Sequence, residues 1–270
     1  MNRLYRSQMD AMLLALVNCL DHAALSGTSV IPWSSPVLSF GDLSTSKVAT
    51  LGLNPSNREF VDGSGKELDG PFRRFHTLKS LRLMRWADAN AKHLRLIVDS
   101  CRAYFRGNPY DSWFKKLDYL ISGTGASYYL GGACHLDLIP YATSCKWTEL
   151  TRRQRASLLT AAGNTLALLL RDSPVRLLIL NGNSVVAQFQ EIGGIQLEEQ
   201  SMADWSLPRQ SSPVGGVAYR GTVRHLSGVK LEDEILVLGF NHNIQSSFGV
   251  TTKVTDAIRQ WIARTAGMFL

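Results

Sequence analysis

The segment at residues 47–56, KVATLGLNPS, decides the fold class of this 270-residue chain. A short apolar run bounded by turn-forming residues predicts a strand that is buried on both faces. The run ends at Asn54-Pro55-Ser56, so we expect the strand to stop in a polar turn. Three further stretches have the same apolar character and lie at residues 131–139, 175–180 and 234–240.

Segments with apolar residues at helical spacing separate these strands, at residues 3–25, 72–91, 92–105, 111–121, 148–171, 184–190 and 253–263. Strands that alternate with helices predict a parallel sheet covered on both faces. We therefore expect an α/β fold, a three-layer αβα sandwich whose mostly parallel central sheet has four or five strands. Residues 193–221 are expected to be irregular, with short edge strands near residues 195–197 and 217–219. We see no linker, and expect one domain over residues 1–270, with residues 1–40 as a helical extension packed on it.

The composition excludes several classes of protein. Hydrophobic residues make up 45% and charged residues 19%, which rules out a disordered chain or a coiled-coil rod. The longest apolar stretches, at residues 11–17 and 165–170, are too short to span a bilayer, and the polar N-terminus argues against a signal peptide. The four cysteines form no C-x-x-C pair, which argues against a zinc or iron–sulfur site. We expect a cytoplasmic monomer with reduced thiols and no membrane partner.

The charge balance bears on the partner. Lysine and arginine outnumber aspartate and glutamate by 29 to 22, which gives a net charge of +7. A basic chain favours a polyanion such as DNA, because each phosphate contact releases counterions. Basic surfaces also occur on proteins that bind no nucleic acid, so the charge alone leaves the partner open.

Polar side chains follow the predicted strands, at Asn54, Asp137, Asn181 and residues 241–243. In parallel sheets the ligand binds beyond the carboxyl ends of the strands, so these residues predict a site. The alternative is that strand ends are simply where the chain meets water.

Four segments in this order resemble the motifs of the uracil–DNA glycosylase superfamily: residues 51–56 (LGLNPS), 135–143 (HLDLIPYAT), 177–189 (LLILNGNSVVAQF) and 239–249 (GFNHNIQSSFG). The resemblance implies that Asn54 orients the attacking water and that His242 donates a hydrogen bond to the departing base. Hydrolysis of an N-glycosidic bond in this way needs neither a metal nor an organic cofactor. The structural alternatives are an Asx-turn at Asn54 and a backbone-bonded histidine at His242.

Two departures from the family pattern bear on the substrate. Uracil-specific members place a bulky tyrosine where this chain has Ser56, so the resemblance implies space for a substituent on C5 of the base. Asp137 occupies the position of the asparagine that reads uracil, and a carboxylate accepts from the exocyclic amine of cytosine. The alternative for Asp137 is a capping or salt-bridging role. Asn241 is a further expected base contact.

Base extrusion calls for a stacking aromatic and for contacts to the DNA backbone. Phe75 is the expected stacking platform, with Phe60 and Phe72 as alternatives, and any of the three could instead be a core residue. The wedge is expected at Ile244 or Phe248, and the alternative is that the base is taken from unpaired DNA without a strong wedge. The expected DNA contacts are Asn57, Arg73, Arg74, Asn243, Ser246 and Ser247.

These residues together predict a DNA glycosylase that hydrolyses the N-glycosidic bond of a flipped-out pyrimidine and leaves an abasic site. The expected base is a hydroxymethylated or glucosylated cytosine in foreign DNA, which fits a role in defence. The alternatives are a glycosylase that repairs uracil or thymine mismatches, a non-catalytic relative that binds modified DNA, and an α/β protein with a small-molecule ligand.

Overall fold

The computed structural model describes residues 3–22, 25–207, 213–245 and 250–269, and the side chains from residue 8 onward. The chain forms two compact units, each built from three separate segments. The first unit comprises residues 1–41, 53–110 and 137–169, and the second comprises residues 42–52, 111–136 and 170–270. Neither unit is a continuous stretch of sequence, because the chain passes from one to the other five times, and two of these passages fall at the ends of β1 and β2.

The second unit contains a six-stranded sheet, of which only the last residue of β2 is assigned to the first unit. Its strands are β1 (Val48–Gly52), β2 (Ala133–Asp137), β3 (Leu177–Asn181), β4 (Glu198–Leu207), β5 (Val214–Leu226) and β6 (Val229–Phe240). The strand order is β2-β1-β3-β6-β5-β4. β3 is parallel to both β1 and β6, whereas β5 is antiparallel to both β6 and β4.

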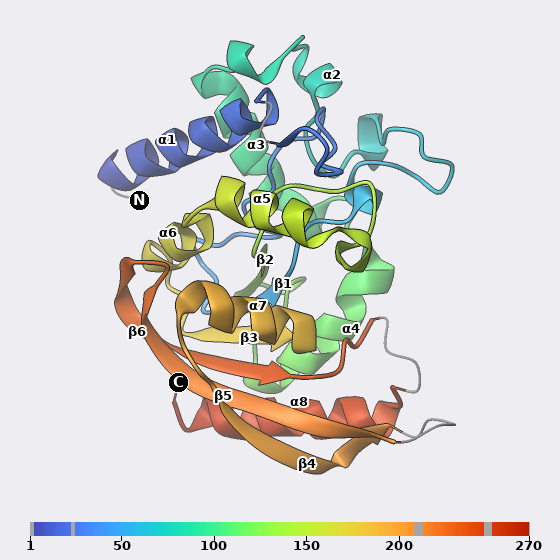
Figure 1. Cartoon of the computed structure of the whole chain (residues 1–270), viewed down its shortest axis with the longest axis vertical. Helices are drawn as coiled ribbons and strands as arrows, with labels where there is room; N and C mark the ends of the chain where they lie inside the picture. The colour runs from blue at the N-terminus through green and yellow to red at the C-terminus, as the bar shows by residue number, and fades with distance from the viewer. Residues whose placement is uncertain (1–2, 23–24, 208–212, 246–249, 270) are drawn as a thin grey trace. The chain divides into compact units, whose positions relative to one another are not determined.

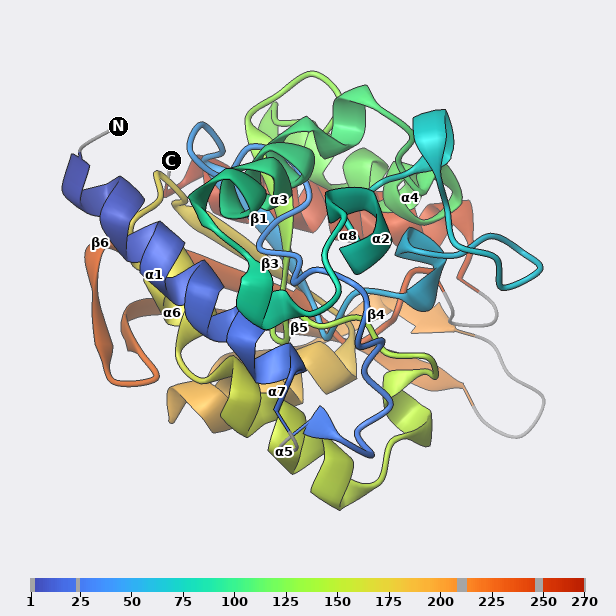
Figure 2. The ribbon, with the colours of Figure 1, turned by 90° about the horizontal axis from the view of Figure 1, so that it is seen from above.

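Helices cover both faces of this sheet (Figures 1 and 2). α7 (Asn183–Gly193) lies on one face, and α8 (Thr252–Gly267) lies on the other, together with α4 (Asp111–Ile121). β1 and β3 are buried along their whole length, which explains why their sequences are mostly apolar. The expected α/β class, with helices on both faces, is confirmed for this unit.

The first unit is mainly helical. Its helices are α1 (Arg3–Leu20), α2 (Leu78–Leu81), α3 (Ala91–Ala103) and α5 (Arg152–Ala162), and α6 (Thr165–Arg171) begins in it. Its 3₁₀ turns are η2 (Asn57–Glu59), η3 (Gly70–Phe72), η4 (Trp86–Asp88), η5 (Tyr104–Arg106) and η7 (Trp147–Glu149), and the second unit has η6 (Ser122–Thr124). Its core is aromatic, with Phe40, Phe60 and Tyr104 packed around Phe75.

Two of the expected helices are wrong in extent. The single helix expected at residues 72–91 is replaced by η3, α2 and η4. α2 is short because Thr77 caps its start and Arg82 adopts a left-handed conformation (φ 57°) at its end. The helix expected at residues 148–171 divides into η7, α5 and α6, and the break between α5 and α6 falls at Gly163 (φ 54°).

The expected sheet of four or five strands is also wrong, because β4 and β5 are long strands in the region expected to be irregular. Glycines concealed β5, since they weaken a strand pattern in sequence. Here they serve close packing: a Cβ at Gly216 would collide with Trp205, and one at Gly221 would approach Leu197. Of the described helices, none is both long enough and apolar enough to cross a membrane.

Candidate functional site

Within the first unit, the segment that follows β1 lies beside the segment that follows β2. The amide of Ile139 donates to the carbonyl of Leu53 at 3.0 Å, and Ser56 and Thr143 form a parallel bridge. The parts of the two sequence motifs that belong to this unit, residues 53–56 and 137–143, are therefore neighbours. Their proximity brings Asn54, Ser56 and Thr143 together.

The side chain of Asn54 is held in one orientation. Its Nδ2 donates to Thr143 Oγ1 at 2.9 Å and to the carbonyl of Pro55 at 3.0 Å. The Thr143 hydroxyl donates its single proton to the carbonyl of Cys145 at 2.7 Å, so it can only accept from Asn54. The group facing Thr143 is therefore the NH₂, and no described residue donates to Asn54 Oδ1. This carbonyl oxygen is left as an acceptor.

Ser56 is exposed and caps the turn that follows. Its hydroxyl donates to Asn57 Oδ1 at 3.3 Å and accepts from the amide of Arg58 at 3.2 Å, at the start of η2. Asp137, the last residue of β2, is half-buried. Its charge acts on Glu59, which lies in η2. Asn54, Ser56, Asn57 and Asp137 all belong to the first unit.

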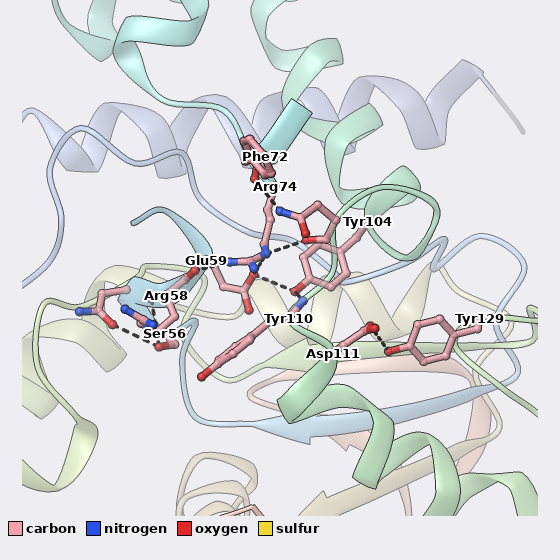
Figure 3. Close-up of polar contacts among 11 residues, drawn as sticks. Ser56, Arg58, Glu59, Phe72, Arg74, Tyr104, Tyr110, Asp111 and Tyr129 are labelled. Atoms are coloured by element: carbon pink, nitrogen blue, oxygen red, sulfur yellow. Dashed lines mark hydrogen bonds and ion pairs between the residues drawn. The ribbon is translucent and has the colours of Figure 1, made fainter. Parts of the chain in front are cut away.

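Glu59 is the residue of this unit that the sequence analysis missed (Figure 3). Only 3% of it is exposed, and Oε2 accepts from the Tyr104 hydroxyl at 2.7 Å. Burial raises the pKa of this carboxyl from 4.5 to about 7, against the opposing effects of the Tyr104 hydrogen bond and the Arg74 charge, while Asp137 raises it further. A glutamate in a turn ordinarily lies in water, so only its position after the Asn54-Pro55 motif could have drawn attention to it.

Arg74 is turned inward instead of toward a phosphate. Its guanidinium donates to the carbonyls of Asn108 and Arg58, and its Nε lies 3.9 Å from Glu59 Oε2. It also lies over the ring of Tyr110, 5.5 Å from its centroid (Figure 3). The expected DNA contact by Arg74 is corrected to an internal clamp, because its Nε and one Nη donate within the unit and its side chain is only 14% exposed. Arg73 is half-buried and stays a prediction.

The expected stacking platform is corrected as well. Phe75 is 1% exposed and stacks on Tyr104, with ring centroids 5.1 Å apart. Phe60 is also 1% exposed. A ring that is almost fully buried has no face left for a base, so both are core residues. Phe72, the remaining alternative, is 65% exposed.

In the second unit, His242 and Asn241 follow β6. His242 is buried, and its Nε2 lies 2.7 Å from the carbonyl of Trp205, which can only accept, so Nε2 carries a proton. The Asn241 side chain binds the backbone of β5 twice, accepting from the amide of Val217 at 2.9 Å and donating to the carbonyl of Gly215 at 2.8 Å. The expected base contact by Asn241 is thereby corrected to a strand clamp.

The remaining expected contacts of the second unit lie in the segment after His242. Asn243 is exposed, and its Oδ1 accepts from the amide of Gln245 at 3.1 Å. Ile244, one of the two expected wedges, is 4% exposed and so is a core residue here. Ser246, Ser247 and Phe248 lie outside the described residues.

Asn181, the last residue of β3, is a buried polar residue of the second unit in which one side-chain atom lacks a hydrogen-bond partner among the described residues. It is 3% exposed, its Nδ2 donates to Gln245 Oε1 at 2.8 Å, and its Oδ1 has no partner among the described residues. Gln245 in turn donates to the carbonyl of Trp113 at 3.5 Å, which fixes the orientation of both amides.

The described part of the chain contains no group of three or more histidine, cysteine, aspartate or glutamate side chains arranged to hold a metal ion. In comparisons with known proteins, no protein-family model matches the chain, and no curated protein sequence matches it significantly.

Proposed function

We propose that this chain is a monofunctional DNA glycosylase that hydrolyses the N-glycosidic bond of a flipped-out pyrimidine. The observation that carries the proposal is the fixed amide of Asn54. Thr143 and Pro55 occupy both protons of its Nδ2, so Oδ1 is presented as an acceptor. An acceptor of this kind can hold a water molecule by one of its protons and aim its lone pair at C1′ of the sugar.

This chemistry does not require Asn54 to remove a proton. The C1′–N bond breaks first, and the base leaves with its electron pair. Neutral water then attacks the oxocarbenium-like sugar, and the proton that this water loses passes to the departed base or to solvent. An amide is a poor base but a good positioning group, and positioning alone lowers a barrier substantially. The requirement is that the amide cannot rotate, which the Thr143 hydroxyl provides.

The base that we propose is a cytosine with a substituent on C5. Ser56 is small and exposed, so the side chain after Pro55 leaves room for such a substituent. Asp137 offers a carboxylate, which accepts a hydrogen bond from the exocyclic amine of cytosine. At the same position uracil has O4, which carries no proton to donate. Both residues belong to the same unit as Asn54. Phe72, with its exposed ring, is the aromatic that suits stacking on the base.

The role of His242 as a donor to the departing base stays a prediction of its own. Its Nε2 proton is engaged with the carbonyl of Trp205, so a second hydrogen bond can be donated only from Nδ1 of the doubly protonated ring. A His242→Gln variant keeps an amide donor near Trp205 and removes the ionisable ring. If His242 acts on the base, this variant loses base release while it retains DNA binding.

The proposal is tested by incubating the purified chain with duplexes that contain 5-hydroxymethylcytosine, glucosylated hydroxymethylcytosine, uracil or a thymine mismatch. Alkali-labile sites at the modified cytosine, lost in Asn54→Ala and kept in the exposed control Asp88→Asn, support it. Release of uracil or mismatched thymine alone overturns the cytosine assignment and favours a repair glycosylase. Retention of modified DNA without any abasic site favours a non-catalytic binder.

A further inference from the structure

A cluster of ionisable side chains lies at η2, the turn that follows Asn54, and the proposed chemistry makes no use of it. It consists of Glu59, Tyr104 and Arg74 (Figure 3). Glu59 is 3% exposed and Tyr104 is 3% exposed, so neither touches a substrate in this conformation. A carboxyl group that is taken out of water needs a hydrogen bond or an opposite charge in compensation, and Tyr104 and Arg74 supply them here.

Each partner of Glu59 joins the turn to another segment of the same unit. The Tyr104 hydroxyl, which donates to Glu59, accepts from the amide of Tyr110 at 2.9 Å. Arg74 donates to the carbonyl of Arg58, inside η2, and to the carbonyl of Asn108 at 2.6 Å. The cluster therefore ties residues 57–59 to residues 104–110.

The turn held in this way is continuous with the proposed catalytic amide. The amide of Glu59 donates to the carbonyl of Ser56 at 3.1 Å, and the Ser56 hydroxyl caps the same turn. Ser56 also forms the backbone bridge to Thr143, whose hydroxyl orients Asn54. A shift of Glu59 would move Ser56. Because Ser56 is close to Asn54 in the chain and bridges to Thr143, this movement would change the positions of both Asn54 and its partner Thr143.

We infer that Glu59 is a positioning residue: with Tyr104 and Arg74, it fixes the turn that holds Asn54 and Thr143 in register. This inference deepens the proposed function and rests on it for the identity of the group that is positioned. The clamp itself is a property of the first unit and can be measured without any substrate.

The clamp formed by Glu59, Tyr104 and Arg74 should depend on pH, because Glu59 is ionisable. A clamp made of uncharged side chains would show no such dependence. Burial raises the pKa of Glu59 to about 7, and the groups that act on it are the Tyr104 hydroxyl, the Arg74 guanidinium and the Asp137 carboxylate. Ionised, Glu59 attracts Arg74 and accepts from Tyr104. Protonated, it loses the attraction to Arg74, and the hold on the Arg58 carbonyl weakens.

The first test is a pH titration of the free protein by nuclear magnetic resonance, in which the side-chain amide of Asn54 is assigned by its loss in Asn54→Asp. We expect its shift to titrate with a midpoint near pH 7, and we expect Glu59→Gln to abolish that titration. The matched control, Asp88→Asn, removes an exposed carboxylate of the same unit that pairs with Arg85 at 3.0 Å, and should titrate as the wild type does. An unchanged titration in Glu59→Gln overturns the inference.

The second test measures base release. Glu59→Gln should lower kcat about tenfold with KM nearly unchanged, and Glu59→Asp should recover part of the loss, because only the position of Asn54 is altered. Tyr104→Phe removes one hydroxyl and should move kcat in the same direction, which keeps the test open if Glu59→Gln folds poorly. A full wild-type kcat in both Glu59→Gln and Tyr104→Phe contradicts the inference. If the wild type releases no base while Asn54 still titrates through Glu59, the clamp stands and the proposed function fails.

Discussion

The side chain of Asn54 donates from Nδ2 to Thr143 Oγ1 over 2.9 Å, although 89 positions separate the two residues along the chain. The direction of this bond is set by a third group, the carbonyl of Cys145, which takes the proton of the Thr143 hydroxyl. Thr143, which takes no part in the proposed reaction, therefore determines that Oδ1 of Asn54 is the atom available to accept from water.

Thr143→Val should separate orientation from chemistry. The valine has nearly the same shape but cannot accept from Asn54, so the amide gains a second orientation. We expect base release to fall about tenfold, which is about 1.4 kcal/mol, close to the net value of one hydrogen bond. Single-turnover kinetics measure the effect, and Thr143→Ser, which restores the hydroxyl, should restore the rate. Equal rates in the valine and serine variants would show that Thr143 does not orient Asn54.

The pH dependence of stability should expose Glu59. Its folded-state pKa is about 7 against an ordinary value of 4.5, so the folded protein keeps a proton that the unfolded chain releases. This group therefore contributes stability below about pH 4.5 and loses it as the pH rises to about 7. By linkage the loss is on the order of 3 kcal/mol.

His76 acts in the opposite direction in the same unit. Burial, reinforced by Arg73, lowers its pKa from 6.5 to about 4, so its contribution is lost as the pH falls from 6.5 toward 4. Between pH 4.5 and pH 6.5 the two groups offset each other. In Glu59→Gln we expect the free energy of unfolding to rise with pH in this window, and in His76→Gln we expect it to fall. Urea denaturation at several pH values checks both, and parallel curves for the two variants would contradict the assignment.

Phe72 and Phe75 form a matched pair for the aromatic platform. Phe75→Ala should destabilise the protein by about 3–5 kcal/mol, because it empties a packed aromatic core. Phe72→Ala should change stability by less than about 0.5 kcal/mol, because its ring is exposed. If Phe72 stacks on the base, its removal weakens DNA binding by about 1–3 kcal/mol. Fluorescence anisotropy and thermal unfolding measure the two effects, and normal DNA binding by Phe72→Ala would remove Phe72 from the site.

Asn241→Ala should act on stability and leave base choice unchanged. The side chain satisfies the amide of Val217 and the carbonyl of Gly215, so its loss should cost about 1–3 kcal/mol. Asn243→Ala is the adjacent control: it removes the acceptor for the amide of Gln245 and leaves both bonds from Asn241 to β5 in place, so β5 should stay anchored. The ratio of base-release rates on hydroxymethylcytosine and uracil should match the wild type in both variants. A changed ratio of these rates in Asn241→Ala would show that Asn241 contacts the base.

Strands that are buried on both faces were the part of the fold most visible in the sequence. The apolar runs at residues 47–53, 175–180 and 234–240 correspond to β1, β3 and the end of β6, because a strand covered by helices on two sides can carry few polar residues. The sequence did not reveal β4, whose side chains are mostly exposed, or β5, which is interrupted by glycines. Their strand conformation depends on pairing with other strands, β5 with β6 and β4 with β5, and no local pattern encodes these contacts between segments.

The candidate site divides in the same way. Apolar runs and turn residues are local signals, so the sequence alone was enough to predict that polar residues follow the buried strands and that Asn54 stands at the first of these ends. The three-dimensional packing was needed to establish that Phe75 is core while Phe72 is exposed, that Arg74 points inward, and that Glu59 is buried beside Tyr104. The physical reason is that burial, and with it the pKa of Glu59 and the orientation of Asn54, is set by partners such as Tyr104 and Thr143 that lie far away along the chain.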